Sequence, residues 1–248
     1  MQLPWLDPGD PLPDAALAWG ESDPVPGLLA AGGGLDVASL LQAYRSGIFP
    51  WFSEGQPILW WSPDPRMVLD VSRFALHRSL RKTLERFRLA GGCEIRIDHG
   101  FEAVISACSK APRPGQSGTW ILPEMVAAYT ALHRAGHAHS VETWIDGELA
   151  GGLYCVAIGR AVFGESMFTR RPDASKIALA ALVAWCRHAQ VRLIDCQQNT
   201  RHLASLGARE IPRAEFVQHV ALHSGHTPAR WQFEPVYWNG LLPHTTPA

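Results

Sequence analysis

The spacing of hydrophobic and polar positions changes repeatedly along the chain, and these changes predict an order of elements. Asp36 is a good N-cap for a helix with Leu40, Leu41 and Tyr44 on one face, which ends before Gly47. The prediction then continues with a strand (67–71), a basic helix (74–87), a strand (93–97), a helix (100–108), a loop (109–118), a helix (123–135), three strands (138–145, 149–158 and 160–168), a long helix capped by Asp173, a strand (191–197), a short helix (200–206) and a last helix after Pro212.

This order predicts a mixed α/β (α+β) fold, in which helices cover both faces of one sheet, as in N-acetyltransferase-like domains. In that fold the sheet splays where the three-strand meander meets the later strand, and a cleft opens there. Residues 1–34 are rich in Pro, Gly and Asp, and a Pro-punctuated aromatic segment precedes residue 66. We therefore expect a small N-terminal domain (1–65) and a catalytic domain (66–248).

Two apolar segments each contain a carboxylate, Glu165 within 161–168 and Asp195 within 191–197. A buried carboxylate is costly unless it has a strong partner or a chemical task, so each residue is either a core ion-pair member or a functional group. The predicted fold places both on elements that border the cleft. Gln197 lies two positions after Asp195, so on a regular strand both face the same side and can share a hydrogen bond or a substrate.

Composition predicts a cytoplasmic protein. The five cysteines form no Cys-x-x-Cys pair, which argues against a disulfide framework or a thiolate metal site. The N-terminus lacks the pattern of a signal peptide, and the longest apolar run, Ile177–Cys186, is about half a membrane span, so we expect neither secretion nor membrane insertion. We also expect no cofactor. His137 and His139 lie two apart, but a further ligand is missing nearby, so no metal site is predicted.

The formal net charge is −1, yet positive charge is concentrated in one helix. Arg78, Arg81, Lys82 and Arg86 recur at spacings of three and four, interrupted by Glu85. Such a face can hold nucleic-acid phosphates, and it can also be an ordinary solvated helix face.

Six motifs resemble leucyl/phenylalanyl-tRNA-protein transferases. They are Gly47–Phe52, Leu59–Arg66, Gly118–Ile121, Gly136–Ser140, Phe163–Phe168 and Leu193–Gln197. The resemblance implies an aminoacyltransferase that moves leucine or phenylalanine, with methionine as a further candidate, from aminoacyl-tRNA to the N-terminal Arg or Lys of a protein. This transfer marks the acceptor protein for degradation by the N-end rule.

The resemblance also assigns roles to residues. Trp51 and Trp120 would sandwich the terminal adenine of the tRNA, and Asp195 would orient Gln197 toward the attacking amine. Glu165 would face the cationic side chain of the acceptor's first residue or help to fix its amine. The basic helix (Arg78, Arg81, Lys82 and Arg86) would bind the acceptor stem. The pocket for the aminoacyl side chain would be formed by Leu153, Val162, Leu179, Leu182 and Cys186.

Several of these pocket residues are smaller than the Met and Phe of better-known members, which predicts a roomier pocket that accepts phenylalanine at least as well as leucine.

Two alternatives belong to other classes. A coenzyme A-dependent N-acetyltransferase would hold pyrophosphate on a glycine-rich turn, and residues 169–175 contain no glycine. A non-catalytic RNA-binding module would use the aromatic and basic surfaces, but it would leave Glu165, Asp195 and Gln197 without a purpose.

Overall fold

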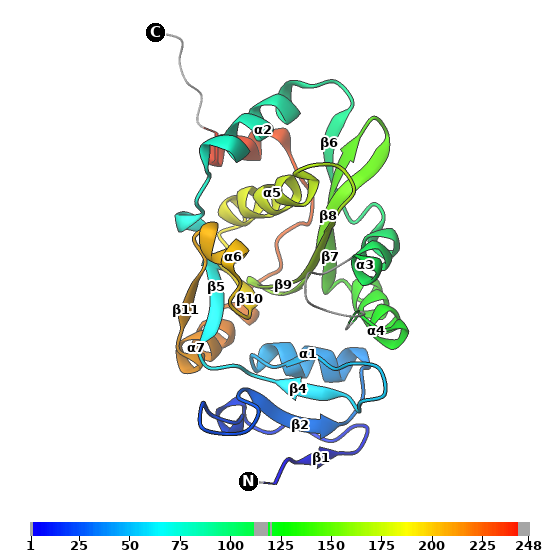
Figure 1. Ribbon diagram of the computed structural model, residues 1–248, viewed down its shortest axis with the longest axis vertical. Helices are drawn as coiled ribbons and strands as arrows, with labels where there is room; N and C mark the ends of the chain where they lie inside the picture. Colours follow the sequence, from blue (N-terminus) through cyan, green and yellow to red (C-terminus); the bar gives the residue numbers. More distant parts are fainter. Residues whose placement is uncertain (1, 112–118, 120, 243–248) are drawn as a thin grey trace.

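Two sheets organise the chain, which the computed structural model describes over residues 2–111, 119 and 121–242 (Figure 1). The smaller sheet has the strand order β1-β2-β4-β3, formed by Trp5–Leu6, Leu28–Gly32, Leu59–Trp61 and Phe49–Pro50. Helix α1 (Val37–Arg45) links β2 to β3. The Asp36 carboxylate accepts a hydrogen bond from the Ser39 backbone amide at 3.1 Å, so the predicted N-cap is confirmed.

The larger sheet has the strand order β11-β5-β10-β9-β8-β7-β6. Its pairs are antiparallel except for β9 and β10, which run parallel. The strands are β5 (Arg66–Asp70), β6 (Cys93–Ile97), β7 (Ala138–Ile145), β8 (Glu148–Ile158), β9 (Ala161–Thr169), β10 (Leu193–Gln197) and β11 (Arg209–Ile211).

Helices cover both faces of the larger sheet, so that a hydrophobic core lies on each face. Alternate side chains of β8 belong to these two cores. Leu153 and Cys155 pack in a core with α2 (Arg78–Leu89) and α5 (Ala174–His188). Tyr154 and Val156 pack in the other, with α1, α3 (Phe101–Lys110), α4 (Pro123–Arg134) and α7 (Arg213–Ser224). The short helix α6 (Arg201–Ser205) follows β10. Figure 1 shows α1 and the small sheet below the end of the larger one, with α5 and α2 above.

The predicted fold class, an α+β acyltransferase-like sheet covered by helices, is confirmed. Two details differ. The edge strand β11 was not predicted, because three residues carry too little periodicity. The predicted side-chain cap at Asp173 is wrong, since its backbone is left-handed (φ 63°) and its carboxylate instead accepts from Lys176 Nζ at 2.8 Å.

The two sheets share one core, because Tyr44 of α1 packs on Phe163 of β9 with ring centres 5.0 Å apart. The domain division at residue 65 therefore stays a prediction. Within the part of the chain that the structure describes, no helix is both long and apolar enough to cross a bilayer.

Candidate active site

The cleft begins where β9 and β10 part. These parallel strands are paired at Ile194–Val162 and Asp195–Phe163, and each then has an irregularity in its pairing with its other neighbour. On β9 the extra residue is Glu165, and on β10 it is Cys196. A bulge bends a strand and redirects side chains, so two bulges at the same level open the sheet there. Gly164 allows the strands to approach, because a Cβ there would lie 3.2 Å from the Asp195 carbonyl oxygen.

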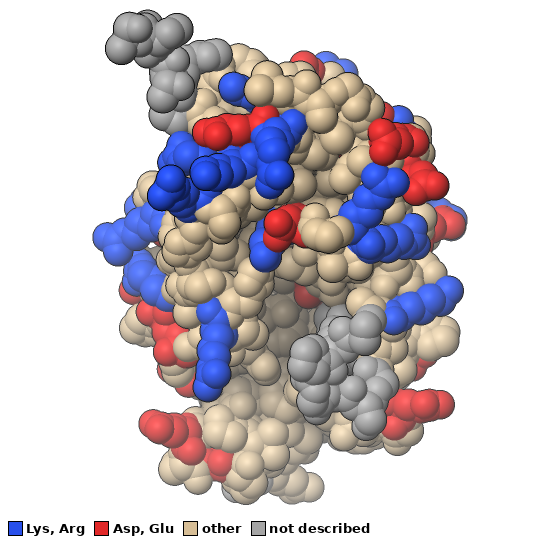
Figure 2. All heavy atoms as spheres, turned by 45° about the horizontal axis from the view of Figure 1, so that its top comes forward, with Lys and Arg blue, Asp and Glu red and all other residues tan. Residues whose placement is uncertain are grey.

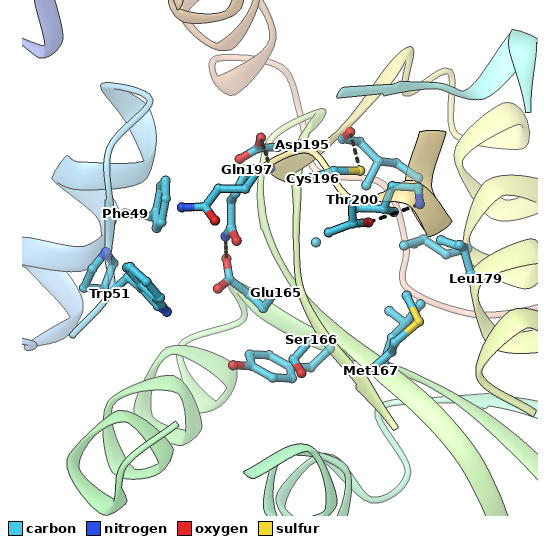
Figure 3. A pocket seen from close by; sticks show the side chains of 18 residues that line it. Phe49, Trp51, Glu165, Ser166, Met167, Leu179, Asp195, Cys196, Gln197 and Thr200 are labelled. Atoms are coloured by element: carbon cyan, nitrogen blue, oxygen red, sulfur yellow. Dashed lines mark hydrogen bonds between the residues drawn. The ribbon is translucent and has the colours of Figure 1, made fainter. Parts of the chain in front are cut away.

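A pocket of about 330 Å3 occupies this opening (Figure 3). One side is formed by Phe49, Pro50 and Trp51 from the small sheet, and the opposite side is apolar, with Met167 and Leu179. Glu165 and Gln197 lie between these two sides. The full lining consists of Phe49, Pro50, Trp51, Leu153, Tyr154, Gly164, Glu165, Ser166, Met167, Leu179, Leu182, Ile194, Asp195, Cys196, Gln197, Gln198, Thr200 and Leu203.

Asp195 is fixed by a buried arginine. Arg66 Nε and Nη2 donate to the two carboxylate oxygens of Asp195 at 2.8 and 2.6 Å, and both side chains are almost fully buried. The guanidinium also donates to the Gly47 carbonyl at 3.1 Å and lies over the rings of Phe49 and Phe216. A bidentate pair of this kind holds both partners in one geometry. It therefore anchors the end of β10 to β5 and to the turn after α1.

Gln197 does not follow the regular strand pattern. Because of the bulge and a left-handed backbone (φ 61°), its side chain departs from the side that the two-residue spacing predicts. A hydrogen bond between Gln197 and Asp195 is present, but its donor is the backbone N–H of Gln197, which lies 2.9 Å from Asp195 Oδ1. The side-chain Nε2 donates instead to Glu165 Oε1 at 3.2 Å. Asp195 thus holds the backbone from which Gln197 reaches Glu165.

Glu165 receives donors from three elements. The Tyr44 hydroxyl donates to Oε1 at 2.7 Å, the Tyr129 hydroxyl to Oε2 at 3.3 Å, and Gln197 completes the set. Desolvation raises the pKa of Glu165 to about 7, and the nearby Asp195 adds to this, while the three donors oppose the shift. Among the described ion pairs none includes Glu165. This carboxylate can therefore change its protonation state near neutral pH.

Cys196 lines the pocket between Asp195 and Gln197 but is a poor nucleophile. Burial raises the pKa of its thiol far above the usual range, and the Asp195 charge adds to this. The thiolate is the reactive form of cysteine, so a neutral thiol here does not favour a covalent acyl-cysteine step.

Of the five residues predicted to line an aminoacyl pocket, Leu153, Leu179 and Leu182 line the pocket described here. Val162 of β9 and Cys186 of α5 itself are buried in the core between the sheet and that helix, and neither is among the described lining residues. The lining instead gains Met167, Ile194 and Leu203, which sequence reasoning did not assign. The pocket thus keeps the predicted apolar character with a partly different set of side chains.

Trp51 lines the pocket and contacts a second tryptophan, Trp61. Trp61 Nε1 donates to the Trp51 carbonyl at 2.6 Å, and the two rings meet edge to face at 5.5 Å. Its predicted partner in adenine binding, Trp120, lies outside the described residues. Trp60 and Trp185 are buried in the core.

The basic helix α2 presents its charges outward. Leu80, Leu84 and Phe87 are buried, whereas Arg78, Lys82 and Arg86 are exposed and Arg81 is half-buried. Figure 2 shows Lys and Arg atoms gathered in the region of α2, above a hollow on the same face. The predicted phosphate-binding residues are therefore available to a large anionic partner.

His139, weighed as a metal ligand, has other partners. Its Nδ1 lies 2.7 Å from Asp98 Oδ2, and its ring stacks on Trp231 with centres 4.0 Å apart.

Besides several lining residues, sequence reasoning missed three residues that contact the two acids, namely Arg66, Tyr44 and Tyr129. Arg66 carried a usable signal, since a cation directly at the start of the apolar run 67–69 is unusual, as is an acid within such a run. Tyr44 and Tyr129 carried none, because a tyrosine on the apolar face of a helix is an ordinary core residue.

Fold and site together define an acyltransferase, in which an apolar pocket for an acyl side chain adjoins a carboxylate and an amide that can bind an amine. Residues 68–221 match the family model described as leucyl/phenylalanyl-tRNA protein transferase, and residues 33–64 match the N-terminal domain of the same family. The chain belongs to the leucyl/phenylalanyl-tRNA–protein transferase family.

Relatives with that name cover nearly the whole chain. The one from Polaromonas sp. is 64% identical over 97% of this chain and 94% of its own, and that from Albidiferax ferrireducens is 61% identical over the same shares. A solved structure described as L-PGS from Bacillus licheniformis is only distantly similar (TM-score 0.39, 12% identity, 68% of this chain and 53% of that chain). The protein is thus an aminoacyltransferase that acts on aminoacyl-tRNA and proteins.

Proposed function

We propose that this enzyme transfers leucine or phenylalanine, with methionine as a further donor, from tRNA to the N-terminal Arg or Lys of proteins in the cytoplasm, and so marks them for N-end rule degradation. The observation that carries the proposal is the apolar pocket directly beside Glu165 and Gln197. A polar or charged aminoacyl side chain would lose its hydration in such a pocket without gaining hydrogen-bond partners.

The donor is held at two points in this proposal. The aminoacyl side chain enters the pocket among Leu153, Met167, Leu179 and Leu182, and the terminal adenine stacks on Trp51, with Trp120 as the second platform. Stacking suits a base that is unpaired and always the same. With both ends of the aminoacyl-adenosine fixed, the ester carbonyl lies near Gln197, and positioning alone supplies part of the rate.

The acceptor is drawn in by charge. An N-terminal Arg or Lys carries two positive charges, and Glu165 is a carboxylate of the pocket that lacks an ion-pair partner among the described residues. Since Gln197 Nε2 is directed at Glu165, its Oε1 is free to accept a hydrogen bond from the attacking amine. Gln197 thus positions the amine, and Asp195, locked to Arg66, holds Gln197 in place.

One experiment tests this function. Leucyl-tRNA with labelled leucine is mixed with the protein and with a peptide that begins with Arg or, as the matched control, with Ala. Label on the Arg peptide alone supports the proposal. Equal labelling of both peptides would contradict the acceptor rule, and labelling of neither would contradict the transfer itself.

Phenylalanine is expected to be transferred at least as fast as leucine. The pocket of about 330 Å3 has a flexible methionine, Met167, in its wall, so it can adapt to the larger ring, which then gains more buried area. Paired transfer rates at equal concentrations of the two aminoacyl-tRNAs check this. A rate for leucine that is tenfold higher would contradict it.

Replacing Arg78, Lys82 and Arg86 together with glutamate is expected to weaken aminoacyl-tRNA binding by at least tenfold, because exposed phosphate contacts turn into repulsion. The slope of log affinity against log salt should become shallower by about 2–3, because binding releases about one counterion fewer for each cation removed. A filter-binding or fluorescence titration at several salt concentrations measures both. The matched control changes Arg96 and Arg134, which already pair with Glu94 and Glu102, and is expected to leave the slope unaltered.

A further inference from the structure

The oxygens around Glu165 form a closed ring with one hydrogen too few. Its three contacts are Tyr44 OH to Glu165 Oε1 (2.7 Å), Tyr129 OH to Glu165 Oε2 (3.3 Å) and Tyr44 OH to Tyr129 OH (2.5 Å). Each contact needs one hydrogen, and the two hydroxyls supply two. An ionised Glu165 leaves one contact unfilled. A proton on Glu165 Oε2 fills it, because Glu165 then donates to Tyr129, Tyr129 to Tyr44, and Tyr44 to Glu165 Oε1.

We propose that Glu165 is the proton acceptor for the attacking amine, and that Tyr44 and Tyr129 are positioning residues that complete its hydrogen-bond ring when the proton arrives. This inference rests on the proposed function. The resemblance assigns Glu165 to the acceptor's cationic side chain or to its amine, and the hydrogen count favours the amine. Gln197 is unsuited to the task, since an amide is a very weak base.

The surroundings fit a group that gains and loses a proton. Both tyrosines are buried, and desolvation raises the pKa of each well above its normal value, so they remain hydrogen-bond donors near neutral pH. Asp195 is neutralised by Arg66, and burial keeps the Cys155 thiol on β8 protonated by raising its pKa. Glu165 itself has a pKa of about 7, close to the working pH of a cell.

The chemical step balances with this one group. The neutral amine attacks the ester carbonyl, a C–N bond forms, and the nitrogen becomes positively charged. Glu165 takes one proton from it. As the C–O bond of the ester breaks, the same proton returns to the leaving ribose oxygen, so that Glu165 ends ionised as it began. The peptide bond and a free tRNA hydroxyl are the products.

The variant Glu165→Gln tests the proposal sharply, because the glutamine amide supplies the missing third hydrogen and keeps the shape. At saturating Arg peptide and pH 8.5 it is expected to be about 100-fold slower than wild type, within the range for general base catalysis. The acceptor amine titrates in both proteins, so it cancels in the ratio of their rates. The wild-type rate divided by the variant rate should fall about tenfold per pH unit below 7, as wild-type Glu165 becomes protonated.

Two outcomes would overturn the proposal. If Glu165 only binds the basic side chain, the variant loses affinity for the peptide while the rates at saturation stay within a few-fold. If Glu165 has a purely structural role, the ratio is the same at every pH. Failure of the proposed function is distinguishable, because wild type would then transfer no leucine to the Arg peptide at any pH.

Tyr44→Phe extends the test to the ring. Loss of a donor to the carboxylate removes an interaction that lowers its pKa, so the pH at which activity rises should move above that of wild type. Tyr237→Phe, on the 3-10 turn Pro235–Gly240, is the control and should leave the profile unmoved. An unshifted profile in Tyr44→Phe would contradict the positioning role.

Folding provides an independent readout. A carboxyl with a raised pKa in the folded state favours folding below its usual value of 4.5, and this advantage is lost as pH rises to about 7. Glu165→Gln carries no such charge, so its Tm should match wild type near pH 5 and exceed it at pH 8. A lower Tm than wild type at pH 8 would contradict the hydrogen count.

Discussion

Asparagine in place of Asp195 is expected to lower the free energy of unfolding by about 3–5 kcal/mol and to abolish most transfer activity. The substitution leaves the buried Arg66 guanidinium without its counter-charge, inside a core that offers it two aromatic rings and one carbonyl. Activity falls because the backbone N–H of Gln197 no longer donates to a charged acceptor, so the Gln197 side chain is positioned less firmly. Denaturant unfolding followed by tryptophan fluorescence measures the first effect, and leucine transfer measures the second.

A double variant separates these effects. Arg66→Met with Asp195→Leu removes both charges, and replacing a buried pair by apolar residues is often neutral, so at least half of the lost stability should return. Transfer should stay low, because Gln197 N–H still lacks its acceptor. A loss below about 1 kcal/mol in Asp195→Asn would show that the pair is far more hydrated than its burial indicates.

Met167→Trp is expected to reduce phenylalanine transfer by about 10³-fold and leucine transfer by about 10²-fold. Met167 lies on β9 with its side chain in the pocket, opposite the aromatic side of the cleft (Figure 3). A tryptophan there takes the space of the donor side chain, which forfeits roughly 1.5–3 kcal/mol of burial and adds about 1–3 kcal/mol of overpacking. Leucine is smaller and suffers less of the second effect. Single-turnover rates with both donors check the order.

Thr169→Trp is the matched control, since Thr169 is exposed at the end of the same strand and is not among the described lining residues. It should leave both rates within about twofold of wild type, because surface changes seldom exceed ~0.5 kcal/mol. Equal losses in both variants would mean that a tryptophan disturbs β9 itself. A Met167→Trp enzyme with an unchanged preference would remove this pocket from donor binding.

The sequence pattern predicted correctly several features that depend only on residues close together in the chain. The strand 93–97 has the predicted bounds because its alternation is sustained, and Asp36 caps α1 because its side chain needs a partner only three residues away. Asp173 shows the limit. Its left-handed backbone turns the carboxylate toward Lys176, and the composition of the turn alone did not reveal that conformation.

The site could be predicted in its chemistry but not in its contacts. Glu165 and Asp195 were found because an acid in an apolar run is costly, and both border the predicted cleft. The side that Gln197 faces was predicted from a period of two, and one bulge at Cys196 cancels that period. Val162 and Cys186 were placed in the pocket by resemblance, yet both are buried in the core that β9 and α5 share.

The amino-acid sequence by itself determined the order of the elements, the apolar character of the pocket and the two acids at its edge, because these follow from periodicity and from the cost of burying charge. Only the tertiary structure decided which groups those acids meet. Arg66 is 129 positions from Asp195 and Tyr44 is 121 from Glu165. Strand register and two bulges bring such distant residues together. Neither the register nor the bulges can be read from the spacing of residues along the chain.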